Sequence, residues 1–313
     1  MIARRHIRLK VMQSLYSYFS NPSNEMSISE KEMAKDIRSI SELHIIIISF
    51  IIELHTYATD FLEENKTKYI PSKEDLNPNT RFLNNRIITA LKKDELLNKK
   101  VSRISSIWRK NDLDIIRKVF VEMYKSQQYS DYLNNKKDDF NQDKKFVQIM
   151  LNEYILDNDI FHFILQEKSI FWTDDLPFIS MFLKGQINNM KENNNNSLVT
   201  DVFKNNDDKK FAIDLFRKTI NNADEFEQLI ESKVKNWELE RISKIDLLLI
   251  KMALTEVISF KEMPIKVSFN EYIEISKYYS TQNSKVFING VLDKIVSQYR
   301  REGKVRKVGR GLV

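Results

Sequence analysis

Glycine and proline are scarce in this chain, with five of each among 313 residues. Tight turns and phosphate-binding loops use glycine where the backbone needs a positive φ or a close approach. The chain is 42% hydrophobic and 30% charged, which suits a buried core with a solvated surface. The composition therefore predicts an all-α fold.

Several common catalytic and cofactor motifs are missing from the sequence. It holds no GxGxxG, GxxxxGK[ST], HExxH or GxSxG pattern, and it holds no cysteine. Dinucleotide fingerprints, P-loops, zinc-protease helices, nucleophile elbows and disulfide frameworks are thereby excluded. The acidic residues are scattered among lysines, as on solvated helical faces. We therefore expect no enzyme, no cofactor and no metal site.

Hydrophobic periodicity predicts the helices. Ile7, Val11, Leu15 and Phe19 recur every four residues, which indicates a first helix that ends at Asn21-Pro22. A long helix is expected at about 41–64, and two or three helices at 84–135. Further expected features are loops at Ile70-Pro71 and Asn77-Pro78, and a polar linker at 188–197.

The C-terminal part has the most regular pattern. Residues 242–260 are apolar on most faces, so this helix is expected at the centre of the fold. Ser268 and Glu271 have the spacing of a capping box, which predicts that a helix starts there. Ser284 is expected to cap the last helix, in which Phe287 lies at core spacing.

No secretory or membrane-spanning segment is evident. The start, MIARRHIRLK, is basic and is not followed by an apolar stretch. The longest apolar run, 45–52, is far shorter than the roughly 20 residues of a membrane span. We therefore expect a cytoplasmic protein.

Positive charge is concentrated at the two ends. Residues 1–20 carry four basic residues and no acid, and residues 295–313 carry six against one acid. The ends thus sum to +9, whereas the whole chain carries +6. Concentrated positive charge is typical of a polyanion binder. The alternative for the C-terminal end is a solvated tail that serves solubility.

The chain also matches itself at an offset of 65 residues. The motif DKKF occurs at 143–146 and again at 208–211, and the same offset pairs Phe161 with Phe226 and Trp172 with Trp237. We hypothesise that 141–190 is a degenerate duplicate of 206–255. The alternative is chance similarity between helices of biased composition.

Two segments carry a more specific signal. The first is Arg4-Arg5-His6-Ile7-Arg8 leading into QSLYS at 13–17. The second combines ERISKIDLLLIKMALTEV at 240–257, PIKVSFNEYIEISKYYS at 264–280 and NSKVFINGVLDKI at 283–295. In this order the segments resemble the NusB family of transcription antitermination factors, over roughly 1–20 and 205–300.

The resemblance implies a compact all-α bundle of NusB type, enlarged by an inserted helical region that contains the degenerate repeat. The implied parts are a first helix at 1–20, an insertion of unassigned role at 21–205, the rest of the bundle at 206–300, and a basic, disordered tail at 301–313. It also implies binding of boxA-type single-stranded RNA from rRNA leaders. The partners would be the ribosomal protein NusE and the antitermination complex on RNA polymerase.

Specific residues fall at the family's functional positions. Asp246 matches an acidic position that faces NusE, although an acid in the first turn of a helix also suits the helix dipole. Phe287 also fits a purely structural core role. The positions that the resemblance assigns to RNA are Arg4, Arg5, His6, Arg8, Tyr279, Asn283, Ser284, Lys285 and Phe287.

Two other functions compete with this interpretation. Some rRNA cytosine methyltransferases carry a NusB-like domain, but they need a glycine-rich cofactor domain after it, and no such sequence follows here. A helical protein-interaction scaffold without RNA binding is the second alternative.

Overall fold

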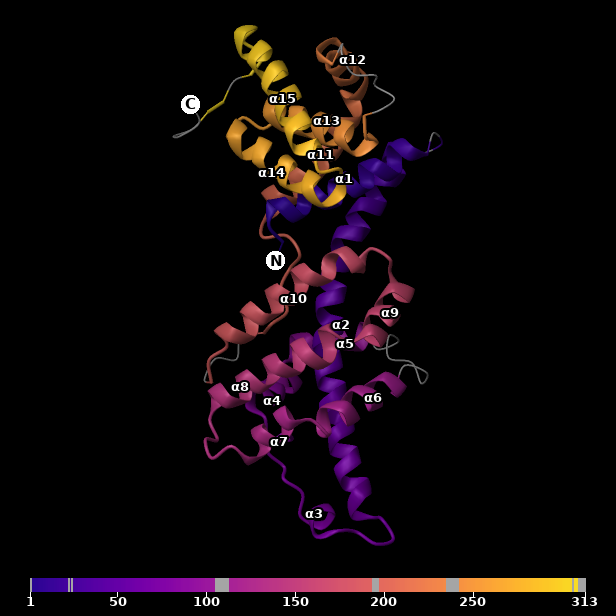
Figure 1. Cartoon of the computed structure of the whole chain (residues 1–313), viewed down its shortest axis with the longest axis vertical. Coiled ribbons are helices and arrows are strands. Elements are labelled where there is room, and N and C mark those ends of the chain that lie inside the picture. The colour runs from indigo at the N-terminus through magenta and orange to yellow at the C-terminus, as the bar shows by residue number, and fades with distance from the viewer. Residues whose placement is uncertain are drawn as a thin grey trace. The chain divides into compact units, whose positions relative to one another are not determined.

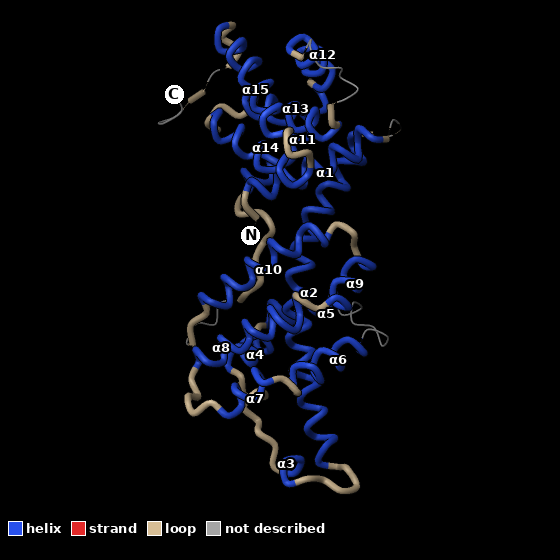
Figure 2. Tube along the Cα trace, viewed as in Figure 1, coloured by secondary structure: helices blue, strands red, loops and turns tan. Residues whose placement is uncertain are grey.

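The computed structural model describes residues 2–21, 23, 25–104, 113–192, 197–234, 242–305 and 307–308. Within these ranges every regular element is a helix and none is a strand (Figures 1 and 2). The predicted all-α class is therefore confirmed. None of the described helices is both long enough and apolar enough to cross a membrane. Trp237, which the offset of 65 residues pairs with Trp172, lies outside the described residues.

The helices follow one another with short connections. In chain order they are α1 (Arg4–Ser20), α2 (Met26–Lys66), α3 (Lys73–Leu76), α4 (Arg86–Lys93), α5 (Glu95–Ile104), α6 (Leu113–Tyr124), α7 (Gln127–Asn134), α8 (Phe140–Ile149), the π-helix η3 (Met150–Leu156), α9 (Asp159–Lys168), α10 (Trp172–Asn189), α11 (Asn206–Asn221), α12 (Ala223–Lys233), α13 (Lys244–Ser259), α14 (Ile265–Tyr279) and α15 (Ser284–Arg301).

The chain divides into two compact units. Unit 1 consists of Met1–Ile37 and Phe203–Val313, and unit 2 consists of Arg38–Val202. Helix α2 begins in unit 1 and continues into unit 2.

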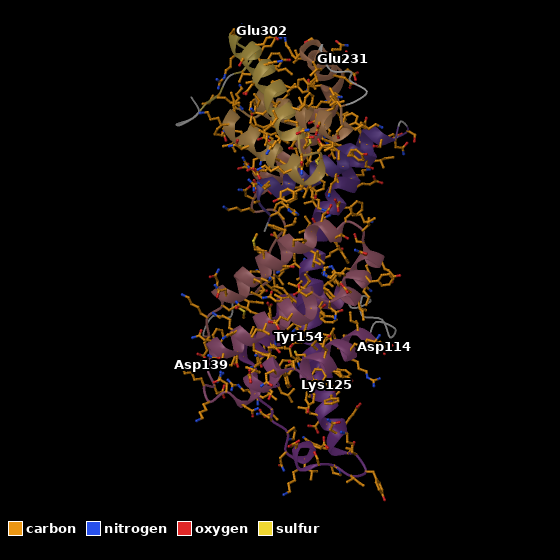
Figure 3. All side chains as sticks on the ribbon, in the orientation of Figure 1. Asp114, Lys125, Asp139, Tyr154, Glu231 and Glu302 are labelled. Atoms are coloured by element: carbon orange, nitrogen blue, oxygen red, sulfur yellow. The ribbon has the colours of Figure 1, made fainter. Side chains whose placement is uncertain are left out.

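Unit 1 is built around α13, which contacts α1, α11, α12, α14 and α15. Because neighbours cover it on several sides, α13 buries a continuous run from Leu248 to Val257. The predicted central helix is thus confirmed. Figure 3 shows side chains filling the space between the helices, with Glu302 just beyond the end of α15.

Two predicted helix starts are wrong. Helix α14 begins at Ile265, directly after Pro264, because proline is compatible with the first turn and needs no N–H partner. Ser268 therefore lies inside the helix, where its hydroxyl donates to Glu256 at 2.7 Å. Ser284 is the first residue of α15 and not its cap, and its hydroxyl donates to Asp246 at 2.7 Å.

Other sequence expectations differ in extent. The long helix starts at Met26, well before residue 41. The described parts of 84–135, which leave out 105–112, hold four helices where two or three were expected. The loops at 70–71 and 77–78 are present. Within the expected disordered tail, Lys307 Nζ donates to the Phe260 carbonyl at 2.9 Å. Residues 306 and 309–313 lie outside the described part of the chain.

Unit 2 has its own aromatic and aliphatic core. Tyr132 stacks on Phe146 with ring centroids 4.2 Å apart, and Phe82 meets Phe146 edge-on. Asp143 is buried in the first turn of α8. It accepts hydrogen bonds from the Arg86 backbone N–H at 3.0 Å, from the Arg86 guanidinium at 2.8 Å and from the Tyr132 hydroxyl at 2.8 Å. These bonds tie the start of α4 to α8.

Candidate nucleic-acid interface

Helix α1 presents its first basic residues beside acidic side chains. Its apolar stripe of Ile7, Val11 and Leu15 is fully buried, which fixes the helix in unit 1. Arg4, at the first helical position, is partly exposed and donates from Nε to Asp208 at 2.9 Å. Its guanidinium also lies over the Phe211 ring at 5.3 Å. Arg4 therefore links the start of α1 to α11.

Arg5 is the most accessible of the predicted arginines, with 59% of its side chain exposed. Its guanidinium donates to both carboxylate oxygens of Glu271, at 2.9 and 2.8 Å. The hydrogen bond from Arg5 is the main cause that lowers the pKa of Glu271. An RNA phosphate at this position would have to compete with that carboxylate.

Arg8 lies in the core of unit 1. Only 2% of its side chain is exposed, and it donates to Glu256 at 2.8 and 2.6 Å. Burial alone lowers the pKa of Arg8, but the hydrogen bond and charge of Glu256 outweigh it, so the pKa is raised. Arg8 thus holds α1 on α13 and has no free path to RNA in this conformation.

The positive charge of α1 is compensated locally. Lys10 is fully buried and its Nζ lies 3.4 Å from Asp36. Together with the three arginines, this gives each of the four cations of α1 a carboxylate neighbour in unit 1. His6 is buried as well. The four positive charges of residues 1–20 therefore do not form a surface patch with a net charge of +4.

Unlike the start of α1, the junction between α14 and α15 combines exposed polar side chains with an exposed aromatic ring. Lys285 and Asn283 are exposed, while Tyr279 and Phe287 are half-buried. Tyr278, which the resemblance did not assign, is 83% exposed. An exposed aromatic ring and an exposed lysine at one helix junction match the two needs of single-stranded RNA, which are stacking platforms for bases and cations for phosphates.

Tyr278 was missed although the helical register contains the signal. Tyr272, Ile275 and Ser276 are buried on α14. A residue seven positions after Tyr272 returns to that same face, so Tyr279 leans toward the core and Tyr278 points outward. The motif comparison favoured Tyr279, whereas the register favours its neighbour.

Ser284 and Asp246 form an internal contact at this junction. Ser284 is buried, and its hydroxyl donates to Asp246 Oδ2 at 2.7 Å. The Ser284 backbone N–H is already used, because it donates to the Thr281 carbonyl at 3.1 Å. Asp246 is 5% exposed, and its carboxylate faces the start of α15. The pair joins the first turn of α13 to the start of α15.

The described residues contain no group of three or more histidine or acidic side chains arranged to hold a metal ion.

Comparison with known proteins finds a family similarity that includes this surface. The family model described as "NusB family" matches residues 179–297, which include the α14–α15 junction but not α1. No solved structure matches the chain.

Three curated relatives carry the name "Transcription antitermination protein NusB". The relative from Salinibacter ruber is 47% identical over 103 residues, or 33% of this chain and 64% of its own length. That from Chloroherpeton thalassium is 39% identical over 105 residues, covering 34% and 50%. That from Natranaerobius thermophilus is 34% identical over 84 residues, covering 27% and 60%.

The matches thus span between half and just under two thirds of these relatives. The C-terminal part of this chain, residues 179–297, is therefore similar to the NusB family.

Proposed function

We propose that this protein acts in transcription antitermination by binding boxA-type single-stranded RNA at the α14–α15 junction. The observation that carries the proposal is the pair of exposed side chains Tyr278 and Lys285 within the NusB-family region. Tyr278 offers a stacking face to an unpaired base, and Lys285 offers a cation to a phosphate. Tyr279, Asn283 and Phe287 complete the surface.

The proposed role of α1 is more limited than that of the junction. Arg5 reaches RNA only by exchanging Glu271 for a phosphate, and Arg4 only by leaving Asp208. Arg8, His6 and Ser284 act through the packing of unit 1, because all three are buried.

The proposed partners are NusE and, through it, the RNA polymerase antitermination complex of rRNA transcription in the cytoplasm. The protein is proposed to act by binding alone, without an enzymatic step. Asp246 contributes by anchoring α15, which keeps Lys285 and Phe287 in place.

Fluorescence anisotropy of a labelled boxA RNA tests this function. The full chain is titrated with and without purified NusE across a salt series, and Arg5→Ala and Phe287→Ala are measured alongside. We expect binding that tightens with NusE and weakens with salt. Binding that is absent even with NusE would favour a helical scaffold without an RNA function.

A further inference from the structure

The match of the chain with itself at an offset of 65 residues extends to the boundaries of the helices. Helix α8 with η3 covers 140–156, which the offset moves to 205–221, and α11 covers 206–221. Helix α9 covers 159–168, which moves to 224–233, and α12 covers 223–233. Helix α10 then corresponds to α13. The contacts between the helices correspond too, since α10 packs on α8 and α9 as α13 packs on α11 and α12.

The buried positions keep the same register. Within these helices, eight pairs of apolar residues 65 positions apart are buried in both units: Phe146/Phe211, Val147/Ala212, Met150/Leu215, Leu151/Phe216, Phe161/Phe226, Leu165/Ile230, Leu183/Leu248 and Ile187/Met252. A buried aspartate also recurs, with Asp143 bonded to the first arginine of α4 and Asp208 to the first arginine of α1. Unit 2 thus repeats the half of unit 1 formed by α1 and α11 to α13.

Unit 1 adds two helices that the described part of unit 2 does not have. Helix α15 covers α12 and α13. On α13 it meets Asp246 through Ser284, and on α12 Glu225 lies beside Tyr299. The described residues between α10 and the end of unit 2 contain no helix. The described part of unit 2 therefore has no helix after α10 that could take the place of α15.

At two positions on α9 and α10, unit 2 has an apolar residue where unit 1 has an acidic residue. The offset pairs Glu225 with Ile160 and Asp246 with Met181. Ile160 is 41% exposed and Met181 is 68% exposed. Large apolar side chains that gather on an exposed face mark a protein interaction site more often than chance exposure does. Phe163, one turn further along α9, is exposed as well.

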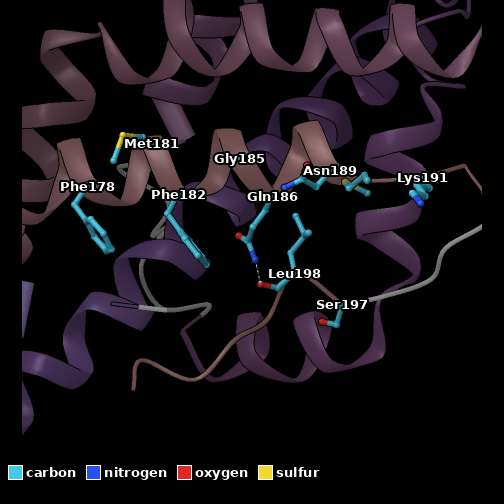
Figure 4. A pocket seen from close by; sticks show the side chains of 10 residues that line it. Phe178, Met181, Phe182, Gly185, Gln186, Asn189, Lys191, Ser197 and Leu198 are labelled. Carbon is cyan, nitrogen blue, oxygen red and sulfur yellow. Dashed lines mark hydrogen bonds between the residues drawn. The ribbon is translucent and has the colours of Figure 1, made fainter. Parts of the chain in front are cut away.

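A groove runs along α10 beside Met181. It has a volume of about 510 Å³ and is lined by Phe178, Phe182 and Lys191 among others. Figure 4 shows the two phenylalanines next to each other on α10, with Gln186 bonded to the Leu198 carbonyl at 2.9 Å. Lys191 lines the groove, and Lys184 lies on α10 three residues after Met181. The groove is therefore apolar with a cationic edge.

We propose that the α9–α10 face of unit 2 docks an acidic amphipathic α-helix of a protein partner, in the place that α15 takes in unit 1. The apolar stripe of such a helix covers Ile160, Phe178 and Met181, and its carboxylates face Lys184 and Lys191. Binding an amphipathic helix in an apolar groove is a common recognition mode. This site is separate from the α14–α15 junction.

A synthetic peptide tests the proposal on the full chain. The peptide has 18 residues, the length of α15, with isoleucine and leucine on one stripe and glutamate at the positions that flank this stripe. A second peptide has lysine in place of every glutamate. We expect the acidic peptide to bind and Met181→Glu to weaken it by about tenfold or more, as for a central contact residue. The matched control is Leu96→Glu, an exposed apolar residue elsewhere in unit 2, which should leave binding unchanged.

Charge reversal provides a second measurement. The Lys184→Glu, Lys191→Glu double variant should lose the acidic peptide and gain the basic one, while RNA binding stays as in the wild type. Three results would each overturn the proposal. These are no peptide binding, equal binding by Met181→Glu, and a concentration-dependent dimer of the wild type that Met181→Glu abolishes. The last result would assign the face to a second copy of this chain.

Discussion

Arg8 and Glu256 form a bidentate ion pair inside unit 1, with N–O distances of 2.8 and 2.6 Å. The hydroxyls of Ser268 and Tyr272 donate to the same carboxylate at 2.7 and 2.9 Å. One buried network therefore joins α1, α13 and α14. It fixes α1 against the helices that carry the proposed RNA surface.

Removing Arg8 should destabilise unit 1 strongly. Arg8→Ala leaves the Glu256 carboxylate buried without its cation, which typically costs about 3–5 kcal/mol. Urea unfolding followed by circular dichroism measures the loss. Arg5→Ala is the matched control, because its exposed ion pair with Glu271 should contribute about 1 kcal/mol or less. Equal losses in the two variants would contradict the assigned role of Arg8.

The corresponding anchor in unit 2 is Asp143. Asp143→Ala removes the buried acceptor of the Arg86 and Tyr132 hydrogen bonds, and we expect a loss of about 1.5–3 kcal/mol in the stability of unit 2. Asp138 pairs with the same Arg86 at 3.0 Å but is exposed. Asp138→Ala should therefore change the stability by less than about 1 kcal/mol. Thermal melts of both variants distinguish the two cases.

His44 should make unit 2 sensitive to mild acid. Burial lowers the pKa of His44 to about 4, although the 2.6 Å hydrogen bond with Gln186 opposes the shift. The unfolded chain therefore binds a proton between about pH 6.5 and pH 4 that the folded chain rejects, so stability falls as the pH falls through this window. The loss approaches about 3 kcal/mol, since one pKa unit corresponds to about 1.4 kcal/mol.

His44→Gln removes this titration. The stability difference between the wild type and His44→Gln should shrink between pH 7.5 and pH 4.5, as measured by urea unfolding. A difference that stays constant over this range would show that His44 is not held neutral by burial.

Lys285 should account for part of the salt dependence of RNA binding. If its ammonium neutralises one phosphate, Lys285→Ala lowers the slope of log K against log salt by about 0.7. Lys266 is exposed on α14, away from the junction, and Lys266→Ala should leave the slope unchanged. If both variants have the same slope as the wild type, Lys285 does not neutralise a phosphate of the bound RNA.

The sequence predicted some parts of this protein and not others. Periodicity identified α1 and the central α13, because burial on one or more faces leaves a repeating apolar pattern. The capping-box prediction at Ser268 failed because the same residue spacing also serves a buried network, in which Ser268 donates to Glu256. Local patterns do not reveal a partner that comes from another helix.

The candidate site shows the same limit. The basic residues of α1 are evident in the sequence, but their carboxylate partners Asp208, Glu256 and Glu271 are distant along the chain. Charge counting therefore overstated the positive surface at α1. The exposure of Tyr278 was available from the register of α14, since the buried Tyr272 and Ile275 define its inner face.

The most direct test of the central claim compares two tyrosines. Tyr278 is 83% exposed at the α14–α15 junction, and Tyr69 is fully exposed in unit 2. Anisotropy of a labelled boxA RNA, with NusE present, is measured for Tyr278→Ala, Tyr69→Ala and the wild type. Losing one stacked base costs about 1–3 kcal/mol. We predict that Tyr278→Ala weakens binding by the corresponding factor of about 5–150, while Tyr69→Ala binds like the wild type. Wild-type affinity in Tyr278→Ala, or equal losses in both variants, would contradict an RNA interface at this junction.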